Sequence, residues 1–381
     1  MVQDKFLNTM TCKKHTLSFI LLFTVILIAA CASQPRVSIE VLPDYNALFE
    51  REDGWTGADG AYTVKLSYNR ILWLFGDTWY GGTRGGRHEN AILINNSIAI
   101  QRGIIPPDVS VNFYTGRAHD GEPRAFVRPS DSRGWFWIYH GIELDKTLYL
   151  YLIQAERTAD RNSFGFKIIG TWLGRVANPE DSPNRWRVSQ HRIPWERLSP
   201  AGDTIFGSAV LGENNFIYIY GTTEDVVGGI RHKSMILARV PETKLEQFDQ
   251  WRFFSAGRWT TDYSKLSRLG GDLANEYSVS YLAALEKYIA VYTAKGLSKN
   301  IVARFAPNPW GPWSEPEVLY ECPEEKWGSD VFCYAAKGHP ELSLAPDEII
   351  VTYVASSLNF EKLASDARLY RPRFLRVRFQ D

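Results

Sequence analysis

Short apolar and aromatic runs alternate with polar turns along most of the chain. Five of these runs resemble one another, at 71–75, 148–152, 216–220, 288–292 and 349–353. A turn rich in Asn, Asp, Glu or Lys precedes each run, and another short apolar segment precedes each turn. Paired runs of this kind, separated by turn residues, predict β-hairpins.

A third predicted strand follows each hairpin, and four of these strands have similar sequences, at 173–176, 237–240, 302–305 and 375–379. A Trp-bearing segment comes next in three units, at Trp186, Trp251 and Trp313. The first strands of the five units are expected to begin near residues 60, 141, 207, 277 and 340. Repeats of about four strands predict an all-β fold, a five-bladed β-propeller with four-stranded blades.

The last repeat lacks an outer strand of its own. The segment 37–42 is expected to supply that strand and so to close the ring. A β-sandwich with long loops is the alternative fold, but the even spacing of the units favours the propeller.

The N-terminus has the pattern of an export signal. Lys13 and Lys14 precede an apolar run that ends at Ala30, and Cys31 follows it. A basic flank, a short apolar run and small residues before a cysteine indicate a lipoprotein signal peptide at 1–31, with Cys31 lipidated. Residues 32–36 are then a short linker and 37–381 a single domain. The segment 28–31 resembles the lipobox of bacterial lipoproteins, and by that resemblance Ala32, rather than Asp, implies the outer membrane, with the lipid anchor as the only membrane contact. The alternative is an uncleaved anchor with an incidental cysteine.

Composition narrows the function. The 381 residues are 45% hydrophobic, and 43 basic residues balance 43 acidic ones. The sequence has no basic stripe, so nothing in it points to nucleic acid as a partner. Two cysteines, Cys322 and Cys333, remain beyond the signal, and the sequence leaves open whether they form a disulfide or stay as thiols.

Two aspartates are the strongest candidates for chemistry. Asp59 precedes one strand and Asp77 follows the next, with a turn between them at 67–70. Folding the hairpin at that turn places the two opposite each other, where like charges should raise one pKa. A glycosidase needs one carboxyl protonated as the acid and another ionised as nucleophile or base. A turn-capping role for one Asp is the alternative.

Other polar residues stand where the first strands are expected to meet the mouth of the channel. Glu276 is a third candidate catalytic carboxylate. The candidate substrate-binding residues at the same expected edge are His140, Ser208, His339 and Glu341. The two histidines could also help hold a central cation, so a central calcium ion is left open, although no metal-ligand motif is present.

Trp79 and Tyr80 follow Asp77 directly and are the aromatic residues expected to form a platform for sugar rings. Most of the 13 Trp and 19 Tyr should instead pack between the repeats.

The stretch 54–62, followed by 72–78, resembles the opening of a group of bacterial families known as domains of unknown function 4185 and 5005. Further agreement lies at 96–97, 276–279, 311–314 and 339–341. The first of these families includes endo-D-arabinanases of glycoside hydrolase family 183, similar to five-bladed furanosidase propellers. The resemblance implies that Asp59 and Asp77 are the family's paired aspartates and that Glu276 is a further acidic position. His140 departs from the pattern, since related sequences tend to have an acidic residue there.

The sequence therefore predicts an exported glycoside hydrolase that acts on a furanose-containing or related polysaccharide or oligosaccharide. A carboxyl separation near 5 Å would give a retaining reaction and about 6.5–9.5 Å an inverting one, and both remain open. The alternatives are a glycan-binding lipoprotein without catalysis, or a structural envelope propeller.

Overall fold

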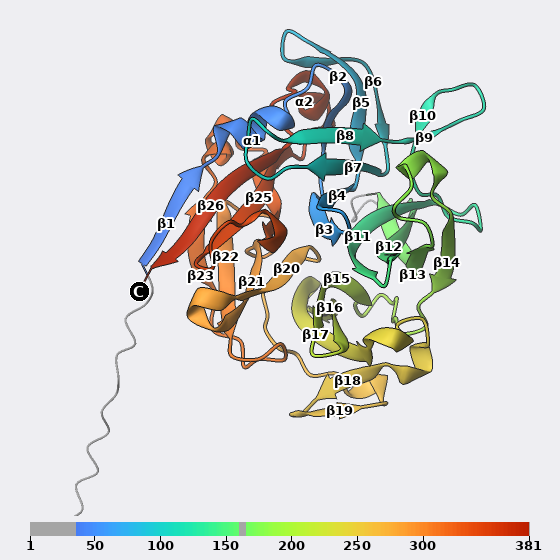
Figure 1. Ribbon diagram of the computed structural model, residues 1–381, viewed down its shortest axis with the longest axis vertical. Coiled ribbons are helices and arrows are strands. Elements are labelled where there is room, and N and C mark those ends of the chain that lie inside the picture. The colour runs from blue at the N-terminus through green and yellow to red at the C-terminus, as the bar shows by residue number, and fades with distance from the viewer. Residues whose placement is uncertain (1–35, 160–164, 381) are drawn as a thin grey trace, which may run out of the picture. The chain divides into compact units, whose positions relative to one another are not determined.

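Hairpins dominate the structure because aromatic and β-branched residues favour extended backbone and polar turn residues join the runs. The computed structural model describes residues 36–159 and 165–380 (Figure 1). The predicted signal peptide at 1–31, with Cys31 and its lipid anchor, lies outside these residues, as does most of the predicted linker. No helix in the described part of the chain is both long and apolar enough to cross a membrane.

Five sheets of four or five antiparallel strands account for most of the described residues. The first sheet contains β3 (Tyr62–Leu66), β4 (Arg70–Phe75), β7 (Ser97–Arg102) and β8 (Ser110–Tyr114). The second contains β11 (Trp135–Leu144), β12 (Thr147–Arg157), β13 (Phe166–Val176) and β14 (Val188–Arg192). The third contains β15 (Thr204–Glu213), β16 (Phe216–Val227), β17 (Ile230–Pro241), β18 (Arg252–Ser255) and β19 (Arg258–Thr260).

The fourth sheet contains β20 (Tyr277–Leu282), β21 (Lys287–Thr293), β22 (Asn300–Ala306) and β23 (Glu317–Glu321). The fifth contains β24 (Val331–His339), β25 (Glu348–Ser357), β26 (Pro372–Gln380) and β1 (Arg36–Val41). β1 pairs with β26 along its length, which confirms that the leading segment supplies the outer strand of the last sheet.

Smaller elements complete the fold. A three-stranded sheet contains β2 (Asp53–Ala58), β5 (Thr78–Arg84) and β6 (Arg87–Ile94), and a two-stranded one contains β9 (Gly116–Arg117) and β10 (Pro123–Arg124). The α-helices are α1 (Pro43–Leu48) and α2 (Phe360–Ser365). Short 3₁₀ turns lie at Pro183–Arg185, Glu242–Lys244, Phe248–Gln250, Tyr263–Lys265, Ala283–Leu285, Pro323–Trp327 and Pro340–Leu342.

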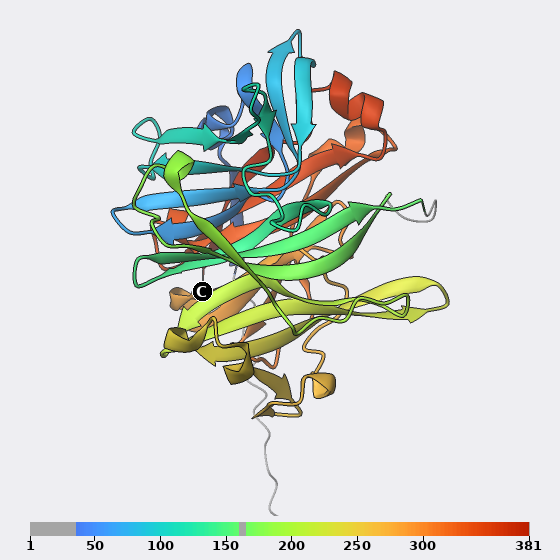
Figure 2. The ribbon, with the colours of Figure 1, turned by 90° about the vertical axis from the view of Figure 1, so that its right-hand side faces the viewer.

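The first strands of the five sheets form a closed circuit of contacts. β3 contacts β11, β11 contacts β15, β15 contacts β20, β20 contacts β24, and β24 returns to β3. The sheets accordingly surround a common centre in Figure 1, and in Figure 2 the green second sheet lies between the blue first and the yellow third.

Apolar side chains fill the spaces between neighbouring sheets. One cluster of buried residues joins the first three sheets, and another joins the fourth and fifth. Phe49 packs in a third cluster against the rings of Trp55, Trp73 and Phe374, at centroid distances of 5.9, 5.1 and 5.1 Å. Trp73 also satisfies its indole N–H on Gln101 Oε1 at 2.8 Å. Most aromatic residues are thus packing residues, because large rings gain most from burial between sheets.

Three of the five first strands begin earlier than the sequence pattern predicts. The starts expected near 141, 207 and 340 lie at Trp135, Thr204 and Val331 instead. Each of these strands contains a register shift, at 138/141, 206/209 and 334/337, where extra residues bulge out of the ladder. Since a strand rises about 3.3 Å per residue, an error of several residues places a side chain far from its expected position along the strand.

Candidate active site

The β3–β4 hairpin brings Asp59 and Asp77 together. Its register pairs Tyr62 with Leu74 and Leu66 with Arg70, so continuing the ladder by three residues sets the two aspartates opposite each other. The Asp59 N–H donates to the Asp77 carbonyl oxygen at 3.2 Å, and both side chains line one pocket of about 560 Å³.

This pocket, called the acidic pocket below, combines carboxylates with aromatic and apolar walls. Glu276 is its third carboxylate, and Lys233 and Lys295 are its lysines. The aromatic side chains in its lining are Trp79, Trp137, Tyr139, Phe166, Phe332, Tyr334, Phe360 and Tyr370. A concave, largely apolar site with a few convergent polar groups is the usual form of a small-molecule site.

Asp59 is held by two tyrosines. The Tyr334 and Tyr370 hydroxyls donate to its Oδ2 at 2.7 and 2.8 Å. Burial, followed by the charges of Asp77 and Glu276, raises the pKa of Asp59 to about 8, while the two tyrosine hydrogen bonds oppose the rise. Removing a carboxyl group from water disfavours its charged form, so Asp59 is the carboxyl that keeps its proton near neutral pH.

Asp77 has different partners. The Trp137 indole N–H donates to Asp77 Oδ1 at 2.9 Å, and the Asn95 amide donates to the same oxygen at 3.4 Å. Burial raises the pKa of Asp77 to about 6, and these two donors oppose the rise. The pair therefore titrates in two steps, with Asp77 ionising first.

Gly76 leaves the space that the Asp59 carboxyl occupies. A Cβ atom on Gly76 would lie 2.4 Å from Asp59 Oδ1 and 3.4 Å from its Cγ. A side chain at this position would therefore displace the Asp59 carboxyl group, so glycine is favoured here by that group rather than by backbone conformation.

Glu276 is paired with a buried lysine. Lys337 Nζ, on a side chain 1% exposed, lies 3.2 Å from Glu276 Oε1 and also donates to the Ala335 carbonyl at 2.8 Å. The ammonium group further lies 4.3 Å from the centre of the Tyr62 ring. Burial lowers the pKa of Lys337, whereas Glu276 raises it. The pairing gives Glu276 a fixed cationic neighbour at ion-pair distance.

Trp79 and Tyr80 separate, because successive residues of a strand point to opposite faces. Trp79 lines the acidic pocket and stacks on His88, with ring centres 4.6 Å apart. Tyr80 lines a different hollow on the other side of β5. The expectation that both rings form one platform beside Asp77 is wrong for Tyr80.

The two histidines expected at the pocket mouth line a second cavity, of about 330 Å³, instead of the acidic pocket. The Val210 N–H donates to His140 Nδ1 at 2.8 Å, so Nε2 carries the proton and donates to the Thr63 carbonyl oxygen at 3.1 Å. His339 contacts the Thr63 and Thr352 hydroxyls through its two ring nitrogens, at 2.6 and 2.7 Å. Burial lowers the pKa of His140 to about 4 and takes that of His339 well below its ordinary value.

Both histidines therefore have each ring nitrogen engaged by the protein, which corrects the expectation that they face substrate beside Asp59. Calcium prefers oxygen ligands, so two engaged imidazoles do not fit a central calcium site. Ser208, fully buried at the β15 bulge, lines neither cavity, and Glu341 lines the second one. The physical cause is shared by His140, Ser208, His339 and Glu341. The strands β11, β15 and β24 begin earlier than expected, so these four residues lie further along or beyond their strands and away from the acidic pocket.

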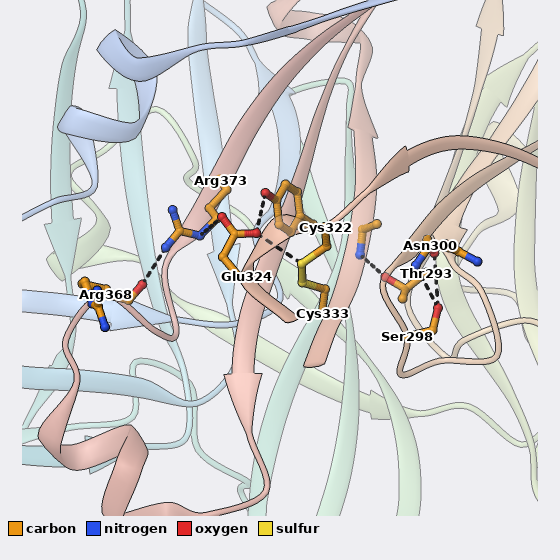
Figure 3. Close-up of a disulfide and its surroundings, with 10 residues drawn as sticks. Thr293, Ser298, Asn300, Cys322, Glu324, Cys333, Arg368 and Arg373 are labelled. Carbon is orange, nitrogen blue, oxygen red and sulfur yellow. Dashed lines mark hydrogen bonds and ion pairs between the residues drawn. A yellow bond between two sulfur atoms is a disulfide. The ribbon is translucent and has the colours of Figure 1, made fainter. Parts of the chain in front are cut away.

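Among residues 36–159 and 165–380, one group of potential metal ligands is close enough to share an ion, namely Cys322, Glu324 and Cys333. The two sulfur atoms form a disulfide, which settles the question that the sequence left open (Figure 3). Bonded sulfurs cannot act as thiolate ligands. Glu324 instead pairs with Arg373 at 3.2 Å and accepts a hydrogen bond from the Tyr353 hydroxyl at 2.9 Å.

Several residues of the pocket carry no signal in the sequence. Tyr334 and Tyr370 lie 275 and 311 positions from the aspartate they contact, and Lys337 lies 61 positions from Glu276. A tyrosine in a sequence with 19 of them is not distinctive. The Trp137 ring belongs to an aromatic strand that packing alone would explain.

The fold and the pocket together define an all-β protein with an acidic, aromatic-walled cavity that several of its sheets help to line. Residues 43–379 match the family described as "Domain of unknown function (DUF5005)", and the chain belongs to that family. No curated protein matches the chain.

Solved structures resemble the chain along most of its length. A candidate hydrolase from Bacteroides ovatus superposes with a TM-score of 0.71 at 20% identity, covering 91% of this chain and 92% of that one, which shows a shared fold. The GH43_1 enzyme from Xanthomonas citri, complexed with xylotriose, gives a TM-score of 0.47 at 13% identity over 89% and 93% of the chains. The catalytic domain of the GH62 α-L-arabinofuranosidase from Coprinopsis cinerea gives 0.47 at 9% identity over 86% and 97%.

Proposed function

We propose that this protein is a glycoside hydrolase that cleaves a furanose-containing or related polysaccharide, with Asp59 as the acid and Asp77 as its carboxylate partner. The observation that carries the proposal is the opposed pair itself: two carboxyl groups in one open pocket whose pKa values are separated by their surroundings. Such a separation is what assigns acid and base roles in carboxylate enzymes.

The proton of Asp59 has a defined position. Its Oδ2 already accepts two tyrosine hydrogen bonds, so the proton resides on Oδ1, the oxygen over Gly76. That proton passes to the glycosidic oxygen as the bond between this oxygen and the anomeric carbon breaks. The two tyrosines then stabilise the carboxylate that remains.

Asp77 is ionised above pH 6 and supplies the negative charge for the second role. It either bonds to the anomeric carbon or removes the proton from a water molecule that attacks there. Glu276, beside Lys337, lies in the same pocket and helps to stabilise the positive charge that develops on the sugar ring in the transition state. The aromatic walls suit the C–H faces of sugar rings.

The architecture and location belong to the same proposal. Five sheets whose first strands form a closed circuit support a five-bladed β-propeller, with the acidic pocket at one end of its channel. The signal pattern before Cys31 supports export to the bacterial envelope with a lipid anchor. The disulfide fits an oxidising compartment outside the cytosol.

The test is turnover by the Asp77→Asn variant on a panel of arabinans and related polysaccharides, measured as the release of reducing ends. We expect kcat to fall by about 1,000-fold or more, since the variant loses the charged partner. Asp145→Asn, in the exposed β11–β12 turn at φ 44°, is the matched control and should keep full activity. Unchanged turnover by Asp77→Asn would overturn the assignment, and saturable binding without products by the parent would favour the glycan-binding alternative.

A further inference from the structure

Tyr80 stands out because its side chain is directed away from the acidic pocket into a hollow of its own. This hollow, of about 360 Å³, is lined by Arg51, Gly54, Trp55, Tyr80, Val111, Asn112, Phe113 and Tyr114. It lies between the start of β2, the strand β5 and the outer strand β8 of the first sheet. None of these residues lines the acidic pocket.

Aromatic rings form much of this hollow. Phe113 stacks on Trp55 with ring centres 4.5 Å apart, and the Arg51 guanidinium carbon lies 5.3 Å from the centre of the Phe113 ring. Tyr80 and Tyr114 are only half-buried, and the Tyr80 hydroxyl lies 3.8 Å from the position of a Cβ on Gly54. Gly54 has φ +75°, so a side chain that could cover the Tyr80 hydroxyl is disfavoured at this position.

Three lining residues of this hollow have side-chain donors without hydrogen-bond partners among the described residues. The buried Trp55 indole N–H has no hydrogen-bond partner within the described part of the chain. The side-chain donors of Arg51 and the Asn112 amide, both on exposed residues, likewise make no hydrogen bond or ion pair among residues 36–159 and 165–380. The donors of Arg51 and Asn112 are therefore free to bind ligand oxygens at the edge of the hollow.

We propose that this hollow is a second carbohydrate site, which binds a sugar ring of the polysaccharide outside the acidic pocket. The inference rests on the proposed function for its choice of ligand. A sugar ring presents C–H groups to an aromatic face and hydroxyl oxygens to donors at its edge, and the hollow supplies both. An anion is a poorer fit, because Arg51 is the single charged residue among the lining residues.

The location links this site to the proposed chemistry. Tyr80 and Trp79 are neighbours on β5, with Trp79 facing the acidic pocket and Tyr80 facing the hollow. A polysaccharide bound on Tyr80 is thereby held on one side of β5, the strand that also carries Trp79 into the acidic pocket. Such a site raises the local concentration of a long polymer and does nothing for a short substrate that fits the acidic pocket alone.

Binding is measured by affinity gel electrophoresis in gels containing soluble arabinan or arabinogalactan, with the Asp77→Asn chain so that the polymer stays intact. We expect Tyr80→Ala in this background to weaken retardation about fivefold, the effect of losing one aromatic contact. Tyr80→Phe, which keeps the ring, should retain most of the binding. Tyr68→Ala, at an exposed tyrosine on the β3–β4 turn, is the control and should change nothing.

Hydrolysis supplies the second measurement. In the active chain, Tyr80→Ala should raise KM for the polymer several-fold and leave kcat/KM for p-nitrophenyl α-L-arabinofuranoside unchanged. Equal losses on both substrates, undiminished retardation of Tyr80→Ala, or no retardation of the Asp77→Asn chain on either polymer would each overturn the site. Retardation that depends on Tyr80 in a protein with no hydrolytic activity would keep the second site and reject the hydrolase. Hydrolysis in a protein whose retardation does not depend on Tyr80 would keep the hydrolase and reject the second site.

Discussion

Tyr370 donates a hydrogen bond of 2.8 Å to the Asp59 carboxyl group, although the two residues lie 311 positions apart in the sequence. Tyr334 donates to the same oxygen, Oδ2, at 2.7 Å. Both tyrosines belong to the last sheet or its connections, whereas Asp59 precedes the first strand of the first sheet. The acid of the proposed reaction is therefore assembled where the two ends of the described chain meet.

Removing either tyrosine hydroxyl should move the alkaline limb of the activity profile to higher pH. The hydroxyls stabilise the ionised form of Asp59, so Tyr334→Phe or Tyr370→Phe raises the pKa of Asp59 further above 8. In a profile of kcat/KM against pH, the limb that reports loss of the acid proton should shift by roughly half to one pH unit.

Tyr353→Phe is the matched control, because that hydroxyl donates to Glu324 away from the acidic pocket. It should leave both limbs in place. A loss of activity in Tyr334→Phe with no movement of the limb would show that the tyrosine acts only through packing.

The raised pKa of Asp59 also predicts a pH-dependent stability. The group ionises near 3.8 when the chain is unfolded and near 8 when it is folded, so the folded state favours the protonated form. Its contribution to stability is complete below pH 4 and is lost as pH rises toward 8. Asp59→Asn cannot ionise, so it should be more stable than the parent at pH 8 by on the order of 2 kcal/mol, and similar near pH 4.

Urea unfolding at pH 4.5 and pH 8.5 measures this difference, with Asp145→Asn as a surface control. Parallel losses of stability in the parent and in Asp59→Asn over this range would contradict the assignment of a buried, protonated Asp59.

The hairpin that pairs the aspartates could be predicted from sequence because it is local. The turn at 67–70 fixes the register, and the ladder from Tyr62 to Leu74 then sets the spacing on both sides of it. The repeated runs and the closing strand β1 were predictable for a related reason, since alternation and turn residues are encoded within a few positions.

The rest of the pocket depends on contacts between distant segments. Tyr334, Tyr370 and Lys337 reach their partners only once the last sheet packs beside the first and fourth. His140 and His339 were misplaced because the bulges in β11 and β24 lengthen these strands, and no turn residue marks a bulge inside a strand. Their fully engaged ring nitrogens follow from that position.

Gly76 offers a test of how closely the Asp59 carboxyl must be placed. Gly76→Ala puts a methyl group where Oδ1 lies, so the carboxyl has to turn away from Asp77. We expect kcat/KM to fall by about 100-fold, the scale of a displacement of about 1 Å in an active site. Gly271→Ala, where an added Cβ has no atom within 4 Å, is the control and should be neutral. Full activity in Gly76→Ala would show that Asp59 is not the proton donor.

The disulfide should stabilise the strand that carries Phe332 and Tyr334 into the acidic pocket. Cys333 lies in β24 between Phe332 and Tyr334, and alternation along the strand directs these two into the pocket and Cys333 away from it. Its bond to Cys322 spans 11 residues and joins β24 to the turn after β23. Replacing both cysteines by alanine should cost about 3 kcal/mol in unfolding free energy. It should also lower kcat, because β24 then holds Tyr334 less firmly against Asp59.

Treatment of the parent with dithiothreitol should reproduce both effects and leave the double variant unchanged. An equal response of the two proteins would mean that the bond does not position Tyr334.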